Sequence, residues 1–138
     1  MPDLRPAILL FIIAAAGWTA GAVAASSVPE RGSSRDCLSL NRIERSEILD
    51  NQHIAFKMID GKYYINVLPV ACPSLHRNSA LMYQTSLSRL CDLDIITVLD
   101  SLGGGYEPRG SCGLGEFNES TQDEVKELRD TLKNPAGK

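Results

Sequence analysis

Residues 53–72, HIAFKMIDGKYYINVLPVAC, constrain the fold more than any other stretch of the chain. Asp60 and Gly61 stand between two runs rich in Ile, Phe, Tyr and Val, which predicts a β-hairpin with a two-residue type I′ turn. Such a turn fixes which residues lie opposite one another. The predicted pairs are Ile59 with Lys62, Met58 with Tyr63, Phe56 with Ile65 and Ile54 with Val67. The last three pairs would form one apolar face, and the other face would combine His53, Ala55 and Lys57 with Tyr64, Asn66 and Leu68.

An isolated hairpin is only marginally stable, so other segments must cover its apolar face. Alternation and β-branched residues predict further strands at residues 37–43, 80–86, 95–99 and 112–117. Residues 100–110 contain three consecutive glycines and predict a long mobile loop. The sequence therefore predicts an all-β fold with one C-terminal helix, in which five or six short antiparallel strands form a small barrel or sandwich.

The C-terminal helix is predicted over residues 122–133. Thr121 and Glu124 have the spacing of a capping box, and acidic residues in the first turn complement the helix dipole. The helix also has a short apolar stripe made of Val125, Leu128 and Leu132. A stripe of this size predicts that the helix docks on the domain's own sheet, with a partner-binding helix as the alternative.

The first 24 residues have the pattern of a secretory signal peptide, with the apolar run AILLFIIAAA followed by small residues. An Ala-Val-Ala sequence at residues 22–24 predicts cleavage after Ala24, with a cut after Ala25 as the alternative. Because residues 7–25 carry no charge, a retained inner-membrane anchor is a second interpretation. Residues 25–36 are polar and predict a disordered lead-in, which leaves residues 37–134 as a single domain.

The formal net charge of −3 limits the choice of partners. A mildly acidic chain gives no electrostatic reason to expect nucleic acid or an anionic membrane surface as partner. After cleavage of the signal peptide, we also expect no stable insertion into a membrane.

The chain has four cysteines, Cys37, Cys72, Cys91 and Cys112. An even number in a small exported domain predicts two disulfides, for which three pairings exist. We favour Cys72 with Cys91 and Cys37 with Cys112, because these would clamp the hairpin exit to a later strand and tie the first strand to the last. A metal site that combines the thiols with His53 or His76 is the alternative, but no C-x-x-C or H-x-x-x-H spacing supports it.

Few residues are candidates for chemistry. Asp92 and Asp94 flank Leu93 after Cys91, so their carboxylates could form a cation site or an acid–base pair. The competing interpretation is that they accept backbone hydrogen bonds at a strand end. Tyr106 and Arg109 lie in the predicted glycine loop and could contact a ligand or partner. No catalytic residue, metal-ligand set or cofactor is predicted, because the G-x-S-x-G, P-loop and dinucleotide motifs are missing from the sequence.

The cysteines and their neighbours also form an ordered pattern. It consists of Tyr64 and Leu68, Cys72-Pro73-x-Leu75, Cys91-x-x-Asp94 and Cys112-x-Leu114-Gly115-x-Phe117. With this pattern, residues 37–117 resemble a family of small exported bacterial proteins known as a domain of unknown function. The resemblance implies an exported, periplasmic, disulfide-stabilised domain, and it implies no activity or catalytic residue.

Two functional hypotheses follow. The first is a non-enzymatic periplasmic module that binds a protein or envelope component, for example as an inhibitor of an envelope-active enzyme. The alternative is a small enzyme or cation-binding protein that uses Asp92 and Asp94. The size, the cysteines and the missing catalytic motifs favour the first.

Overall fold

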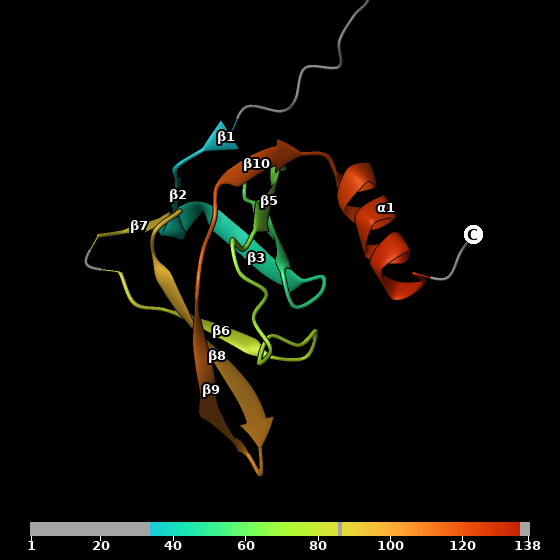
Figure 1. Cartoon of the computed structure of the whole chain (residues 1–138). Helices are drawn as coiled ribbons and strands as arrows, with labels where there is room; N and C mark the ends of the chain where they lie inside the picture. The colour runs from blue at the N-terminus through green and yellow to red at the C-terminus, as the bar shows by residue number, and fades with distance from the viewer. Residues whose placement is uncertain (1–33, 86, 136–138) are drawn as a thin grey trace, which may run out of the picture.

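The computed structural model of the chain describes residues 34–85 and 87–135. The predicted signal peptide and residues 25–33 of the lead-in lie outside the described residues. The described ranges form three antiparallel sheets and one C-terminal α-helix, as Figure 1 shows. This arrangement confirms the predicted fold class. None of the three sheets closes on itself, so the sandwich describes the architecture and the barrel does not.

The largest sheet has five strands, in the order β1-β10-β5-β4-β3. Residues 34–35 form a strand that pairs with β10, so their predicted place in a disordered lead-in was wrong. A two-residue strand carries no alternating pattern that a sequence could display. The strands are β1 (Ser34–Arg35), β3 (Ile43–Ile48), β4 (His53–Met58), β5 (Tyr63–Val67) and β10 (Phe117–Ser120).

Two smaller sheets complete the sandwich. One pairs β2 with β7, and the other has the order β6-β8-β9. A short 3₁₀ helix, Leu40–Arg42, connects β2 to β3, where the sequence predicted one continuous strand. The strands of the smaller sheets are β2 (Cys37–Ser39), β7 (Arg89–Cys91), β6 (Ala80–Tyr83), β8 (Ile95–Leu102) and β9 (Gly105–Gly113).

The predicted hairpin is confirmed, but its register is shifted by one residue. The Gly61 N–H donates to the Met58 carbonyl at 3.0 Å, and the Met58 N–H donates to the Lys62 carbonyl at 2.8 Å. Gly61 has a φ of +84°, whereas Asp60 has a negative φ. These features define a three-residue loop with a type I turn and a glycine bulge, in place of the type I′ turn.

This shift exchanges the two faces of β5. Phe56 lies opposite Tyr64 and Ile54 lies opposite Asn66, so Tyr64 and Asn66 share the face on which Phe56 and Ile54 enter the main core. Ile65, predicted to lie in the main core, instead lies on the opposite face of the sheet, where it packs against the cluster that contains Val125. Because side chains alternate along a strand, a one-residue error moved every β5 side chain to the wrong face.

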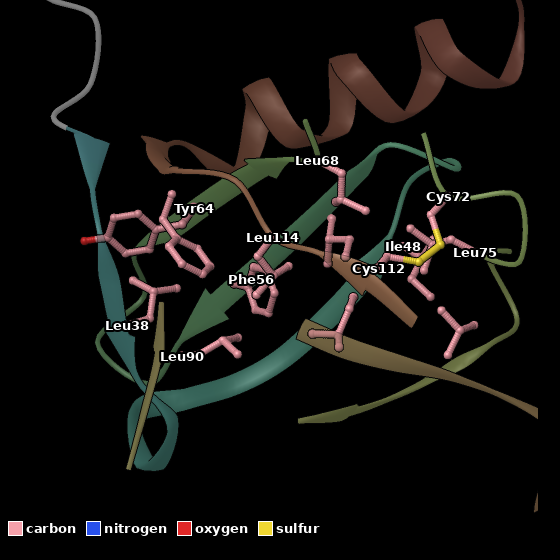
Figure 2. Packing of buried hydrophobic residues seen from close by; sticks show 14 of the residues in the cluster. Leu38, Ile48, Phe56, Tyr64, Leu68, Cys72, Leu75, Leu90, Cys112 and Leu114 are labelled. Atoms are coloured by element: carbon pink, nitrogen blue, oxygen red, sulfur yellow. A yellow bond between two sulfur atoms is a disulfide. The ribbon is translucent and has the colours of Figure 1, made fainter. Parts of the chain in front are cut away.

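The main core lies between the five-stranded sheet and the two smaller sheets. Figure 2 shows side chains from both sides meeting around Phe56. The rings of Phe56 and Phe117 pack edge to face, with their centroids 5.5 Å apart. Tyr64 and Leu114 belong to the same cluster. Removal of these apolar side chains from water is the main force that holds the layers together.

A second hairpin occupies the predicted glycine loop. β8 and β9 pair directly, with Leu102 opposite Gly105. The two residues between them, Gly103 and Gly104, have φ values of +60° and +95°. Two successive positive φ angles are typical of a type I′ turn, so the glycines make a tight hairpin and the prediction of a mobile loop was wrong.

The C-terminal helix, α1 (Gln122–Lys133), is confirmed with its predicted bounds and capping box. The N–H of Thr121 donates to the carboxylate of Glu124, and the N–H of Glu124 donates to the Thr121 hydroxyl at 3.2 Å. The bond from the Thr121 backbone lowers the pKa of Glu124 below its ordinary value. Val125 is buried against Leu49 and Ala55, so the apolar stripe docks on the outer face of the large sheet.

Both disulfides exist, but their pairing differs from the one that the sequence analysis favoured. Cys37 is bonded to Cys91 and Cys72 to Cys112, which leaves no free cysteine. Cys37 and Cys91 lie directly opposite each other in β2 and β7, a pairing that the sequence did not predict. The Cys72–Cys112 bond joins the segment after β5 to β9, as Figure 2 shows. No helix in the described ranges is long and apolar enough to span a membrane.

Candidate functional site

The most distinctive surface feature is a groove of about 460 Å³ beside β3. We call it the basic groove, because three arginines line it and only one acidic residue does. Its walls come from β3, from the start of β6 with the segment before it, and from α1 (Figure 1). The lining residues are Arg45, Ser46, Glu47, Ile48, Arg77, Ser79, Leu81 and Arg129.

β3 divides its side chains between two faces. Ile48 is buried in the main core, whereas Glu47 pairs with a residue of α1 on the outer face of the sheet. Since side chains alternate along a strand, Ser46 shares the core face with Ile48, and Arg45 shares the outer face with Glu47. Arg45 is exposed and makes no ion pair with any residue that the structure describes.

Arg129 of α1 closes one side of the basic groove. Its Nη2 atom lies 2.6 Å from Oε2 of Glu47, and both side chains are partly exposed. The Nε atom of Arg129 is buried and has no hydrogen-bond partner in the described part of the chain. Glu47 therefore compensates one arginine of the groove, and this ion pair also ties α1 to the edge of the sheet.

Arg77 and Ser79 form the opposite side of the basic groove. The Nε–H of Arg77 donates to the carbonyl oxygen of Leu49 at 2.8 Å, which holds Arg77 at the end of β3. The Ser79 hydroxyl donates to Oδ1 of Asp100 at 2.9 Å. Oδ2 of Asp100 lies 3.2 Å from Nε of Arg109, which neutralises this carboxylate at the rim. The groove thus keeps its positive surplus.

The side chain of Ser46 connects β3 to β6. The Tyr83 hydroxyl forms a hydrogen bond with the Ser46 side chain. Burial raises the pKa of Tyr83 above its ordinary value, and the bond to Ser46 partly offsets this rise. Tyr83 therefore stays neutral at physiological pH, and its contact with Ser46 is a neutral hydrogen bond that positions β6 against β3.

A second, smaller cavity of about 330 Å³ adjoins the basic groove. It shares Arg45, Glu47 and Arg129 with the groove, and α1 contributes Lys126 and Asp123 to its wall. The positive surface therefore extends from the edge of β3 along the side of α1.

The residues that the sequence analysis singled out lie elsewhere. Oδ2 of Asp94 accepts a hydrogen bond from the N–H of Cys91 at 2.6 Å. Asp94 therefore accepts a backbone hydrogen bond at the end of a strand, which was the competing interpretation of this residue. Asp92 follows β7, and its N–H donates to the Asp36 carbonyl. Tyr106 is exposed on β9, which is a strand and not the predicted loop. Arg109, also on β9, reaches only the rim of the basic groove, through Asp100 and Ser79.

The two histidines also remain apart from the basic groove. Nδ1 of His53 lies 2.8 Å from Oδ1 of Asp50, in the turn between β3 and β4. His76 is exposed in the segment before β6. The described residues contain no group of three or more side chains that could hold a metal ion.

Sequence reasoning did not identify the basic groove. Arg45, Arg77 and Arg129 come from three different elements, and no local motif connects them. The sequence shows only three arginines in unrelated segments of a chain whose overall balance is acidic.

Comparisons with family models, curated proteins and solved structures found no match for this chain.

Proposed function

We propose that this protein is an exported, non-enzymatic module that binds an anionic partner through the basic groove. One observation carries the proposal: three arginines line the groove against one glutamate, and that glutamate is already paired with Arg129. Arg45 and Arg77 make no ion pair with any described residue. Guanidinium groups bind carboxylate, phosphate and sulfate through paired hydrogen bonds, so they suit an anionic ligand.

Several features support export. Disulfides persist in oxidising compartments, and this small domain has two of them. The apolar N-terminal segment has the pattern of a cleaved signal peptide, and the resemblance to small exported proteins remains a prediction that agrees with it. Both features support a location in the periplasm or outside the cell as part of this proposal.

The alternative that uses Asp92 and Asp94 finds no supporting observation, because Asp94 accepts a backbone hydrogen bond from Cys91 at 2.6 Å.

A calorimetric titration with an oligomer of glutamate tests the proposal. We expect binding at low salt that weakens as the ionic strength rises, because exposed charges are screened. The variant Arg45→Glu should bind at least about tenfold more weakly, since it reverses a charge in the groove. Arg89→Glu is the matched control, because Arg89 is exposed on β7 outside the groove. If the two variants lose affinity equally, or if the original protein does not bind, the proposal is wrong.

A further inference from the structure

The basic groove runs beside a strand that has no partner on one side. β3 ends the five-stranded sheet, and in the described residues it pairs only with β4. β6 is the edge of its own sheet, and residues of both strands line the groove. An open edge of this kind offers backbone groups that can pair with another chain.

The register identifies which backbone groups are free to pair. The Leu49 N–H donates to the His53 carbonyl at 2.9 Å, so Leu49 and His53 form a hydrogen-bonded pair. The next pair along the ladder is Ile48 with Ile54, followed by Glu47 with Ala55 and Ser46 with Phe56. Hydrogen-bonded and non-hydrogen-bonded pairs alternate in an antiparallel ladder. Ser46 and Ile48 therefore direct their N–H and C=O groups away from β4, toward the groove that both residues line.

We propose that the basic groove binds an extended acidic segment of a partner protein, which adds to β3 as an antiparallel strand. This inference rests on the proposed function and specifies its partner. A strand that pairs with Ser46 and Ile48 would satisfy their outward backbone groups, which is the general mode of β-augmentation.

The groove also specifies which side chains the added strand carries. Residues opposite Ser46 and Ile48 would point toward the core face, where partly buried Leu81 borders the groove. Their neighbours would point to the outer face, near Arg45 and Arg129. The matching segment therefore alternates apolar and acidic residues.

A second copy of the same chain fits this edge poorly. Pairing β3 with another β3 would bring two grooves together, each lined by three arginines and one glutamate, so their two positive surpluses would repel each other. The charges that oppose self-association favour an acidic strand.

Backbone methylation of a peptide probe tests strand addition directly. The probe is a capped octapeptide of alternating glutamate and valine, made also in two forms methylated on the backbone nitrogen of either the valines or the glutamates. In antiparallel addition the valine N–H groups bond to β3 and the glutamate N–H groups point away. We expect the valine-methylated form to bind at least about tenfold more weakly than the glutamate-methylated form, since it loses the hydrogen bonds to the carbonyls of Ser46 and Ile48.

A pair of variants gives a second, independent test. Ser46→Pro removes the outward N–H at a position where an edge strand tolerates proline. Ser46→Ala is the matched control, because it loses the hydroxyl that contacts Tyr83 and keeps the N–H. We expect Ser46→Pro to weaken binding of the unmethylated peptide at least about fivefold, and Ser46→Ala to change it less than twofold. Circular dichroism establishes that each variant is folded, and the methylated peptides decide the question if Ser46→Pro does not fold.

The two proposals can fail separately. If both methylated peptides bind equally well and oligoglutamate also binds, strand addition is wrong while anion binding remains. If neither the peptides nor oligoglutamate bind, both proposals are wrong.

Discussion

The side chain of Asn66 and the backbone of Gly115 exchange two hydrogen bonds inside the domain. The Gly115 N–H donates to Oδ1 of Asn66 at 2.9 Å, and the amide nitrogen of Asn66 donates to the Gly115 carbonyl. Asn66 is a fully buried polar residue of the core, with an exposed fraction of 0%. This exchange connects β5 to the segment between β9 and β10.

Replacing Asn66 with Ala should lower the free energy of unfolding by about 2 kcal/mol, because the partly buried N–H and C=O groups of Gly115 would both lose their hydrogen-bond partner. Asn118→Ala is the control, since the Asn118 amide is exposed and its bonds are long, at 3.4 Å. Urea denaturation measures both variants. Equal effects at the two positions would contradict the account.

Substitution of Gly115 should also destabilise the folded protein. A Cβ atom at this position would lie 2.1 Å from the carbonyl oxygen of Val67, so Gly115→Ala forces the backbone to move. We expect a loss of at least about 2 kcal/mol in the free energy of unfolding. Gly113→Ala is the matched control, because a Cβ there meets no atom within 4 Å. A wild-type melting temperature for Gly115→Ala would show that this close approach is absent.

The disulfide pairing can be tested by mass spectrometry of peptides from the unreduced protein. Trypsin cleaves after Arg42, Arg77 and Arg109, which places each cysteine on a separate peptide. We expect linked peptides that contain Cys37 with Cys91 and Cys72 with Cys112. A link between Cys72 and Cys91 would instead support the pairing that the sequence analysis favoured.

Thr121→Ala should weaken α1 by about 1 kcal/mol, because it removes the side-chain acceptor for the Glu124 N–H. Thr121→Ser keeps the hydroxyl and is the control. The free energy of unfolding, followed by circular dichroism, measures the difference. Identical stabilities of the two variants would show that the capping box contributes nothing.

Asp50 should make stability depend on pH in the acidic range. Burial alone would raise the pKa of Asp50, but bonds from the Gln52 and His53 backbone and from the His53 ring outweigh it and lower the pKa. A carboxyl with a lowered pKa stabilises the folded state above its unfolded pKa and loses this effect as the pH falls. We therefore expect the original protein to lose more stability than Asp50→Asn as the pH falls below about 4. Parallel losses in the two proteins would contradict this role.

The helix and the first hairpin were predictable because their signals are local. The capping box of Thr121 and Glu124 and the stripe around Val125 lie within one short segment, and the structure confirms them. The predicted register of the hairpin was wrong by one residue, because the type of turn depends on which residues adopt a positive φ. Only Gly61 does so, and Asp60 does not.

The rest of the fold depends on contacts between distant segments. Cys37 meets Cys91 because β2 and β7 pair, and neither three-residue strand has a pattern that reveals it. The basic groove likewise exists only after Arg45, Arg77 and Arg129 converge from three elements. The pattern of glycines in the second hairpin was visible, but Gly103 and Gly104 were interpreted as a loop rather than as a type I′ turn.

The central claim is that the basic groove binds an anionic partner, and arginine side-chain NMR tests it most directly. The Nε–H signals of a ¹⁵N-labelled protein are followed while oligoglutamate is added. We predict that the signals of Arg45, Arg77 and Arg129 shift together with a single affinity, while that of Arg89 on β7 stays in place. Shifts centred on other arginines, or no shift at all, would contradict the claim.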